Sequence, residues 1–408
     1  MVHFLCFVFK KLSSQANVFD FANGDFQQLN YFLASINWVN LFSGLELDDM
    51  VTAFYNVVFF GMDTYIPKKR VHYFSSTYPR WFNKELKDLC RLKKIAHSVY
   101  KKSGRYDDYE YFKILRTQCK ELNENLYNSY LSKVSDSITN NPQFFWKFIN
   151  DRKKSSGIPC EMQYFQKFAK TGTEISNLFA EFFSSVYVED ANNDFDQEFD
   201  GINEVADSGL KVELSEVFEN IARLKHSFHP GADGIPNVLL KNCIYTITMP
   251  LCELFKVSLS QGKFPKAWKN SYVTPIFKSG DRNKIDNYRG VCNQSTIPKI
   301  FDSIVAKQLE WISSSIISIK QHGFRKQRST CTNLMEYYCY LNEAFDKKLQ
   351  VDSVYTDFSK AFDKVNHRLL FCKLRHLGFN NNTVKWLTSF LSERSQQVRI
   401  GSYMSSPY

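Results

Sequence analysis

Hydrophobic residues recur at helical spacing through the first half of the chain. One run consists of Leu86, Leu89, Leu92 and Ala96, and a second consists of Phe112, Leu115, Cys119, Leu122 and Leu126. Residues 101–104 separate the two runs and end in Gly104, a typical helix stop. Pro142 precedes a third, shorter run over residues 144–149. We therefore expect residues 81–138 to form a helical pair, with a short helix after it.

After residue 210 the hydrophobic pattern alternates between helix and strand spacing. Helices are predicted from Ser215, over residues 251–261 before Gly262, over residues 297–312, and over residues 365–377 before Gly378. Strands are predicted over residues 272–277 and 351–358, and residues 229–234 read as a turn cluster. This pattern indicates the α+β class, with helices and strands packed in separate layers.

Length and composition limit the class of protein. A chain of 408 residues is expected to hold two or three domains, and 44% hydrophobic with 16% aromatic content argues against a disordered chain. The sequence contains no apolar run near the ~18 residues of a membrane span, so we expect no membrane partner. Ten cysteines without a Cys-x2-Cys pair disfavour a zinc ribbon and indicate a reducing compartment. The apolar residues 4–9 are too few for a signal core and are expected to form a strand or helix edge, or to mark a gene-model start inside a longer protein.

Charge is unevenly distributed along the chain. The total is +10, but residues 1–67 carry −4, residues 68–170 carry +12, residues 171–210 carry −10 and residues 211–408 carry +12. Two basic blocks suit a polyanion such as nucleic acid, although a solvated basic surface is an equal alternative. The same choice applies to the helical pair, as an RNA-binding arm or as solvated helices. The acidic stretch over residues 189–207 is predicted to be a linker.

The strand predicted over residues 351–358 ends at a carboxylate, Asp357, and a turn follows it. Strand ends hold side chains rigidly, and Mg²⁺ is usually bound by one or two carboxylates together with substrate phosphates. Asp357 is therefore a candidate magnesium ligand for phosphoryl or nucleotidyl transfer. Taken alone, an aspartate at this position is more often a cap or turn residue.

The order of several short motifs changes that interpretation. Residues 229–242 read HPGADGIPNVLLKN and are followed by Trp268-Lys269, the TPIFK of residues 274–278 and the NYRG of residues 287–290. QHGFR (321–325), RST (328–330) and the Asp357 segment come next. This ordered set resembles the reverse transcriptases of non-LTR (LINE-type) retrotransposons, the jockey-like clade above all. A looser resemblance extends upstream to about residue 19.

The resemblance implies roles for individual residues. Asp357 matches the first metal-binding aspartate of the palm, with the Phe358 carbonyl as a supporting ligand and Mg²⁺ as the expected ion. Phe362 matches the bulky residue that excludes a ribonucleotide 2′-hydroxyl, and Ala361 lies beside it. Lys278 and Arg289 match fingers residues that hold the incoming triphosphate, a role that suits their charge. The segment close to template and primer is matched by Gln321, Gly323, Phe324 and Arg325.

The same resemblance implies a domain plan. Residues 1–67 would be a connector after a missing endonuclease, residues 68–188 a basic helical region, residues 189–210 an acidic linker, and residues 211–408 the fingers and the start of the palm. The rest of the palm and the thumb are expected to be missing. The expected partners are an RNA template, a DNA primer and deoxynucleoside triphosphates, and the expected location is nuclear or cytoplasmic.

The family also needs two further aspartates in a Phe/Tyr-Ala-Asp-Asp hairpin. The pairs Asp48-Asp49 and Asp107-Asp108 do not fit it, because neither has an aromatic residue two positions earlier and both precede Asp357. We therefore expect a fragment of an RNA-directed DNA polymerase that is inactive as written. A non-catalytic RNA-binding protein and a non-functional transposon remnant are the alternatives.

Overall fold

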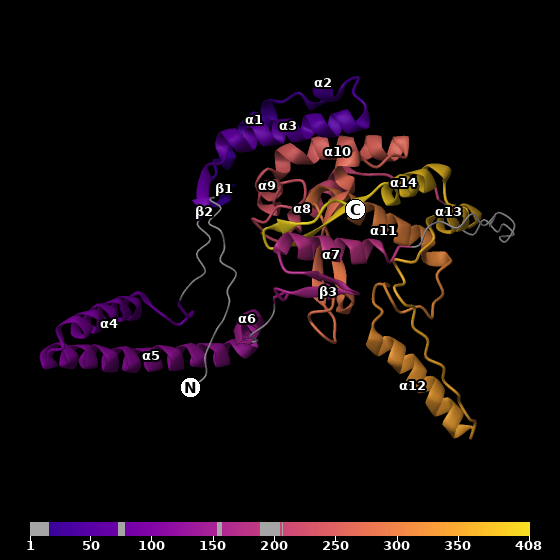
Figure 1. Cartoon of the computed structure of the whole chain (residues 1–408). Coiled ribbons are helices and arrows are strands. Elements are labelled where there is room, and N and C mark those ends of the chain that lie inside the picture. The colour runs from indigo at the N-terminus through magenta and orange to yellow at the C-terminus, as the bar shows by residue number, and fades with distance from the viewer. Residues whose placement is uncertain (1–15, 72–77, 153–156, 188–204, 206) are drawn as a thin grey trace. The chain divides into compact units, whose positions relative to one another are not determined.

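The computed structural model of the chain describes residues 16–71, 78–152, 157–187, 205 and 207–408 (Figure 1). The predicted edge element of residues 4–9 lies outside these residues, as does most of the predicted acidic linker. Contacts divide the chain into two units, one made of Met1–Val18 and Lys69–Ile158, the other of Phe19–Lys68 and Pro159–Tyr408. The sequence-based domain boundaries divide the chain differently, and as functional domains they stay a prediction.

The first unit is a hairpin of two long helices. Its helices are α4 (Lys84–Ser103), α5 (Tyr106–Asn140) and α6 (Pro142–Arg152). The Asn83 side chain accepts a hydrogen bond from the Leu86 backbone N–H at the start of α4, and Gly104 adopts a left-handed φ of 63° at its end. Leu115 and Cys119 are buried on α5. The predicted helical pair and its glycine stop are confirmed.

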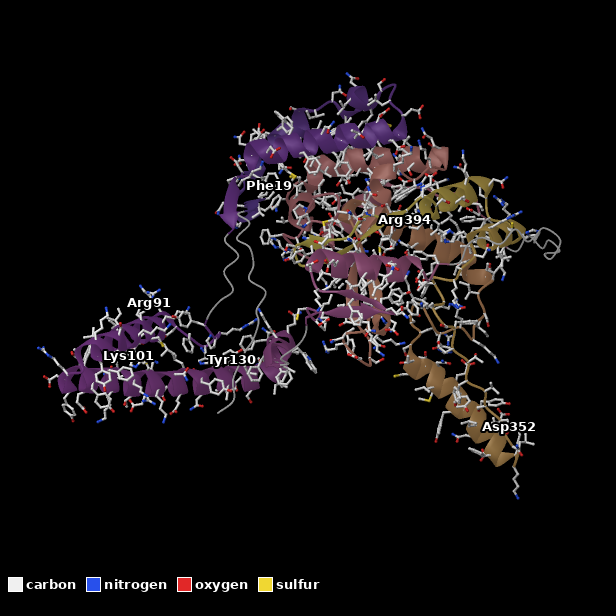
Figure 2. The ribbon with its side chains drawn as sticks, in the orientation of Figure 1. Phe19, Arg91, Lys101, Tyr130, Asp352 and Arg394 are labelled. Carbon is white, nitrogen blue, oxygen red and sulfur yellow. The ribbon has the colours of Figure 1, made fainter. Side chains whose placement is uncertain are left out.

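Charged and aromatic side chains cover this hairpin. Figure 2 shows Arg91 and Lys101 on α4 and Tyr130 on α5. The Trp81 indole N–H donates to Asn123 Oδ1 at 2.9 Å, and its ring packs against Tyr127 with centroids 4.9 Å apart. Aromatic contacts therefore fix the chain that leads into α4 against α5. Two short strands, β1 (Ala16–Phe19) and β2 (Lys68–Val71), lie where the chain passes between the units.

The second unit contains a helical core. Its helices are α1 (Phe26–Ser35), α2 (Trp38–Phe42), α3 (Leu47–Tyr65), α8 (Leu214–Ala222), α9 (Asn237–Asn242), α10 (Ile244–Gln261) and α11 (Thr296–Ile312), with short 3-10 turns η1 (Phe21–Asn23) and η4 (Ser313–Ser315). Phe255 of α10 stacks on Phe301 of α11, with centroids 4.3 Å apart. Both rings are fully buried, as is Trp268. The predicted helices at 215, 251–261 and 297–312 are confirmed.

One buried polar network joins α3 to the turn of residues 229–234. The Tyr55 hydroxyl donates to Asp233 Oδ2 at 3.2 Å and accepts from the Trp268 indole N–H at 3.2 Å. Burial, followed by the nearby Asp233 carboxylate, holds the pKa of Tyr55 well above its usual range. Residues 19–68 thus share one core with residues after 210.

A four-stranded sheet in the order β6-β5-β7-β8 forms the second layer. Its strands are β5 (Asn270–Phe277), β6 (Tyr288–Gln294), β7 (Ser395–Ile400) and β8 (Tyr403–Met404). β5 pairs antiparallel with β6 and parallel with β7, and β7 pairs antiparallel with β8. The hairpin of β3 (Met162–Tyr164) and β4 (Lys167–Ala169) precedes α7 (Gly172–Ser184), which packs on β7 and β8. The strand predicted over 272–277 is confirmed as β5.

Three helices complete the unit: α12 (Thr330–Asp346), α13 (His367–His376) and α14 (Asn381–Leu391). The helix predicted over 365–377 is confirmed as α13, and Gly378 has a φ of 91°. The strand predicted over residues 351–358 is wrong, because these residues are irregular and, apart from the half-buried Val351, exposed. A strand requires a neighbour for its hydrogen bonds, and no strand of the described residues pairs with this segment. The mixture of helix and sheet is compatible with the predicted α+β class.

No helix in the described part of the chain is both long enough and apolar enough to span a membrane.

Candidate active site

A cavity of about 590 Å³ lies beside the β5–β6 hairpin. Six of the ten residues singled out from the sequence line this cavity: Lys278, Arg289, Asp357, Phe358, Ala361 and Phe362. They come from the end of β5, from β6 and from the irregular segment after residue 356. The fold therefore gathers in one place residues that are distant in the sequence.

The hairpin geometry places both predicted triphosphate ligands. Arg289 on β6 pairs with Ile276 on β5, and the backbone N–H of Lys278 donates to the Asn287 carbonyl at 2.9 Å. Between these strands lies the 3-10 turn η3 (Ile285–Asn287). Both cationic side chains are exposed at the cavity. Two solvated cations fixed on one hairpin are well placed to bind an anion.

The segment of residues 357–363 forms the facing wall. Lys360 has a φ of 54°, and its carbonyl accepts a hydrogen bond from the Lys364 N–H at 3.1 Å. The Lys360 ammonium lies 5.0 Å from the centre of the Phe182 ring on α7. A turn and a cation–π contact thus hold this wall in place, rather than the strand that we predicted.

Three aspartates line the cavity: Asp286, Asp357 and Asp363. Binding through one or two carboxylates plus substrate phosphates is the usual mode for Mg²⁺, and Asp357 with the Phe358 carbonyl is compatible with it. Nowhere in the described residues do three or more histidine, cysteine, aspartate or glutamate side chains gather closely enough to hold a metal ion. These residues therefore fit a metal that arrives with the phosphates of a nucleotide better than a permanently bound ion.

The back of the cavity is formed by residues that sequence reasoning missed. The hydroxyls of Tyr187 and Tyr408 both donate to Gln396 Oε1, at 3.3 and 3.2 Å. Burial raises the pKa of both tyrosines, and the Asp363 carboxylate adds to this effect, so both stay neutral donors. The parallel pairing of β5 with β7 brings Gln396 here, and no local motif marks that pairing.

The predicted template and primer residues are absent from the described lining of this cavity. Gln321 Nε2 donates to the Gly323 carbonyl at 3.3 Å, and Arg325 Nη1 donates to the Ile317 and Ser318 carbonyls at 3.2 and 3.1 Å. Arg325 is thus used to fix its own loop. Phe324 is the link to the cavity, because its ring packs against that of Phe362.

Part of the chain matches a known protein family. Residues 276–406 match the family described as "Reverse transcriptase (RNA-dependent DNA polymerase)". That range contains Lys278, Arg289 and the 357–363 segment.

Three similar curated proteins come from mobile elements of insects. The chain is 25% identical over 306 residues to "Probable RNA-directed DNA polymerase from transposon BS" of Drosophila melanogaster, covering 72% of this chain and 33% of that protein. It is 30% identical over 198 residues to "RNA-directed DNA polymerase from mobile element jockey" of the same species, covering 48% and 22%. The R2 "Retrovirus-related Pol polyprotein from type-1 retrotransposable element" of Popillia japonica is 27% identical over 172 residues, covering 42% and 23%.

The chain spans between about a fifth and a third of the length of these relatives. The family match covers β6, β7, β8 and residues 357–363 of the second unit, and two of these relatives are named as RNA-directed DNA polymerases. Together these matches support a reverse transcriptase of the LINE type, found in non-LTR retrotransposons, as the kind of protein that this chain is similar to.

Proposed function

We propose that this chain supplies the nucleotide-binding part of an RNA-directed DNA polymerase. In this proposal the cavity binds a deoxynucleoside triphosphate, with Lys278 and Arg289 on its phosphates and Phe362 beside its sugar. Residues 211–408 are the fingers and the start of the palm. This proposal rests on one observation. The residues to which the motifs give these roles come from different elements, yet they all line the same cavity.

Divalent metal ions are generally used by reverse transcriptases. We assign Mg²⁺ to Asp357 and the Phe358 carbonyl, with nucleotide phosphates completing its oxygen ligands. When bound, the ion would neutralise developing charge on the phosphates and polarise them for transfer. Lys278 and Arg289 orient the triphosphate. Positioning of this kind is the main contribution that a protein makes to nucleotidyl transfer.

We further propose that residues 1–408 by themselves do not extend a primer. A two-metal site needs several carboxylates around ions roughly 4 Å apart, and Asp357 is the only metal aspartate that the family motifs assign here. Loss of one preorganised electrostatic contact commonly lowers a rate about 100- to 1000-fold. The second and third metal carboxylates would have to be added for activity.

The partners that follow from this role are an RNA template, a DNA primer and deoxynucleoside triphosphates, in the nucleus or the cytoplasm. Net charges of +12 in residues 68–170 and in residues 211–408 support nucleic-acid binding. The same charges favour the second candidate, an RNA-binding protein without catalysis. A non-functional remnant is the third, and it would bind neither nucleotide nor RNA.

Binding of radiolabelled dTTP with Mg²⁺ tests the proposal. The double substitution Lys278→Gln/Arg289→Gln should weaken dTTP binding roughly 10- to 100-fold, the size expected for lost charged hydrogen bonds. Arg223 and Lys225 are exposed at the end of α8, outside the cavity. The control variant Arg223→Gln/Lys225→Gln removes the same charge and should leave dTTP binding unchanged. Equal affinities for all three proteins would contradict the nucleotide site. RNA binding without any dTTP binding would favour the second candidate.

A further inference from the structure

A second concave surface lies between the end of α10 and α14, on residues other than those of the nucleotide cavity. This groove has a volume of about 930 Å³. Four cationic side chains line it, Lys263, Lys269, Arg375 and Lys385, against one carboxylate, Glu393. Its remaining lining is polar: Ser260, Gln261, Asn381, Thr388, Ser389 and Ser392 with Gly262. A surface of this composition attracts anions and offers them many hydrogen bonds.

The floor of the groove is rigid. Gly262 ends α10 with a φ of 62°, and a Cβ there would lie 2.8 Å from Asn382 Oδ1. The Asn382 side chain donates to the Leu259 carbonyl at 2.6 Å, and the Phe264 N–H donates to Ser389 Oγ at 2.9 Å. These bonds join the end of α10 to α14, so the cations are presented from a fixed frame.

The aromatic core supports the same frame from beneath. Trp386 of α14 donates its indole N–H to Ser258 Oγ of α10 at 3.0 Å and packs edge-on against Phe264. Arg394, labelled in Figure 2, lies 4.8 Å from the Phe390 ring centre and donates to the Phe390 carbonyl at 2.9 Å. The Arg394 guanidinium thus binds the end of α14, whereas the neighbouring Glu393 lines the groove.

Lys269 is the unusual cation of the set. Its side chain is only 8% exposed, and it belongs to the 3-10 turn η2 (Lys266–Lys269). Its ammonium pairs with the Glu393 carboxylate, which lies 3.8 Å away and is itself 79% exposed. A solvated carboxylate at this distance makes only a weak ion pair. The Lys269 side chain is thus held by its packing at the edge of the groove and remains able to interact with an anion there.

The other three cations are accessible. Arg375 of α13 and Lys385 of α14 are exposed, whereas Lys263 pairs with Asp48 of α3 at 3.1 Å between its ammonium and Oδ2. Lys263 and Lys269 are therefore partly neutralised, and Arg375 and Lys385 carry the unbalanced charge. Two unpaired cations beside the weakly paired Lys269, along an open groove, match successive phosphates of a strand better than a single small anion.

We propose that this groove binds the phosphodiester backbone of a nucleic acid strand. The identity of that ligand rests on the proposed polymerase function, which requires template and primer, but the groove itself is separate from the nucleotide cavity. It would hold a part of the nucleic acid away from the reacting end. Sequence-independent backbone contacts of this kind position a strand without reading its bases.

Fluorescence anisotropy with the whole 408-residue chain tests the groove. The probes are a labelled single-stranded RNA and an RNA–DNA hybrid duplex of the same sequence. The double substitution Arg375→Glu/Lys385→Glu should weaken binding on the order of tenfold, and should lower the slope of log Kd against log salt by roughly 1.4 for single-stranded RNA. The probe that loses more affinity identifies the strand form that occupies the groove.

Lys256→Glu is the control. Lys256 is exposed on α10, the helix whose end borders the groove, but it does not line the groove. Lys256→Glu should change neither the affinity nor the salt slope. Both substituted residues in the double variant are exposed, so folding is expected to survive, and retained dTTP binding at the cavity verifies it.

The proposal is overturned if the double variant binds both probes as the unsubstituted chain does, or no more weakly than Lys256→Glu. It is also overturned if the unsubstituted chain binds neither probe. In that last case dTTP binding that depends on Lys278 and Arg289 would leave the nucleotide site standing, so the two proposals fail separately.

Discussion

The rings of Phe324 and Phe362 meet edge to face, with centroids 6.1 Å apart and planes at 87°. Both side chains are otherwise largely exposed, at 91% and 79%. The contact joins the loop of residues 321–325 to the wall of the nucleotide cavity. An exposed ring on an irregular segment has several rotamers available, so the Phe324 contact restricts where Phe362 points.

Phe362→Ala should relax the choice of sugar. If Phe362 excludes a 2′-hydroxyl, its removal should raise the affinity for UTP relative to dUTP roughly 10-fold, since differences of one small group change selectivity by this order. Phe324→Ala should act in the same direction with a smaller effect. Competition binding of the two nucleotides measures the ratio, and Phe345→Ala, an exposed phenylalanine on α12, is the control. An unchanged ratio in Phe362→Ala would refute this role.

His322 holds α12 against the loop that carries Phe324. Its side chain is 4% exposed, with Nδ1 2.8 Å from Thr332 Oγ1 and Nε2 2.9 Å from Glu336 Oε2. His322→Ala removes both bonds, so amide hydrogens of α12 should exchange up to about 100-fold faster, the equivalent of about 1–3 kcal/mol. Exchange read by mass spectrometry tests this, with the exposed His226→Ala as control. Unchanged exchange across Thr330–Asp346 would show that other contacts hold the helix.

The Tyr55 hydroxyl should stabilise the shared core of the second unit. Tyr55→Phe leaves the buried Trp268 indole N–H and Asp233 without a shared partner. Leaving buried polar groups unpaired typically costs about 1–3 kcal/mol of unfolding free energy. Urea unfolding followed by fluorescence measures the loss. Tyr31→Phe removes an exposed hydroxyl and should have little effect, so equal losses in the two variants would contradict the network.

Asp302 makes stability depend on pH. Burial raises the pKa of this α11 carboxyl to about 6, and Oδ1 has no hydrogen-bond partner in the described residues. The folded protein holds the Asp302 proton more tightly than the unfolded chain does. The protonated carboxyl therefore makes its full contribution to the free energy of unfolding below pH ~4, and this contribution is lost as pH rises through about 6. At neutral pH the buried charge should lower stability by on the order of 2–3 kcal/mol.

Asp302→Asn should therefore raise the urea midpoint at pH 7 and flatten its dependence on pH between about 4 and 7. Asp346→Asn, an exposed aspartate at the end of α12, is the matched control and should do neither. A variant less stable than the unsubstituted chain at pH 7 would mean that the Asp302 carboxylate makes a favourable contact, and the predicted sign would be wrong.

Periodicity was enough to predict α4, α5, α10 and α11, whereas α3 and α12 were not predicted. α10 and α11 bury one continuous face each, so their hydrophobic spacing survives in the fold, and Gly262 and Gly378 end helices because they adopt positive φ. The segment of residues 351–358 has strand composition but forms no strand. Strand propensity reflects packing against neighbouring strands, and none of the described residues provides one there.

The candidate site was predictable only where motifs mark it. Lys278, Arg289 and Asp357 stand in short patterns whose order points to the family, and they line one cavity. Tyr187 and Gln396 reach the same cavity through the packing of α7 and the parallel β5–β7 pair, contacts between residues far apart in sequence. Local pattern carries no information about such pairings, and the basic groove beside α14 was missed for the same reason.

Photo-crosslinking of an azido-substituted dATP, followed by peptide mapping, tests the central claim most directly. With Mg²⁺ present, adducts should form on peptides that contain residues 273–292 and 357–363, and unlabelled dATP should remove them by competition. Lys278→Gln/Arg289→Gln should reduce these adducts, while Arg223→Gln/Lys225→Gln should not. Adducts that resist competition, or that map only to other parts of the chain, would contradict a nucleotide site in this cavity.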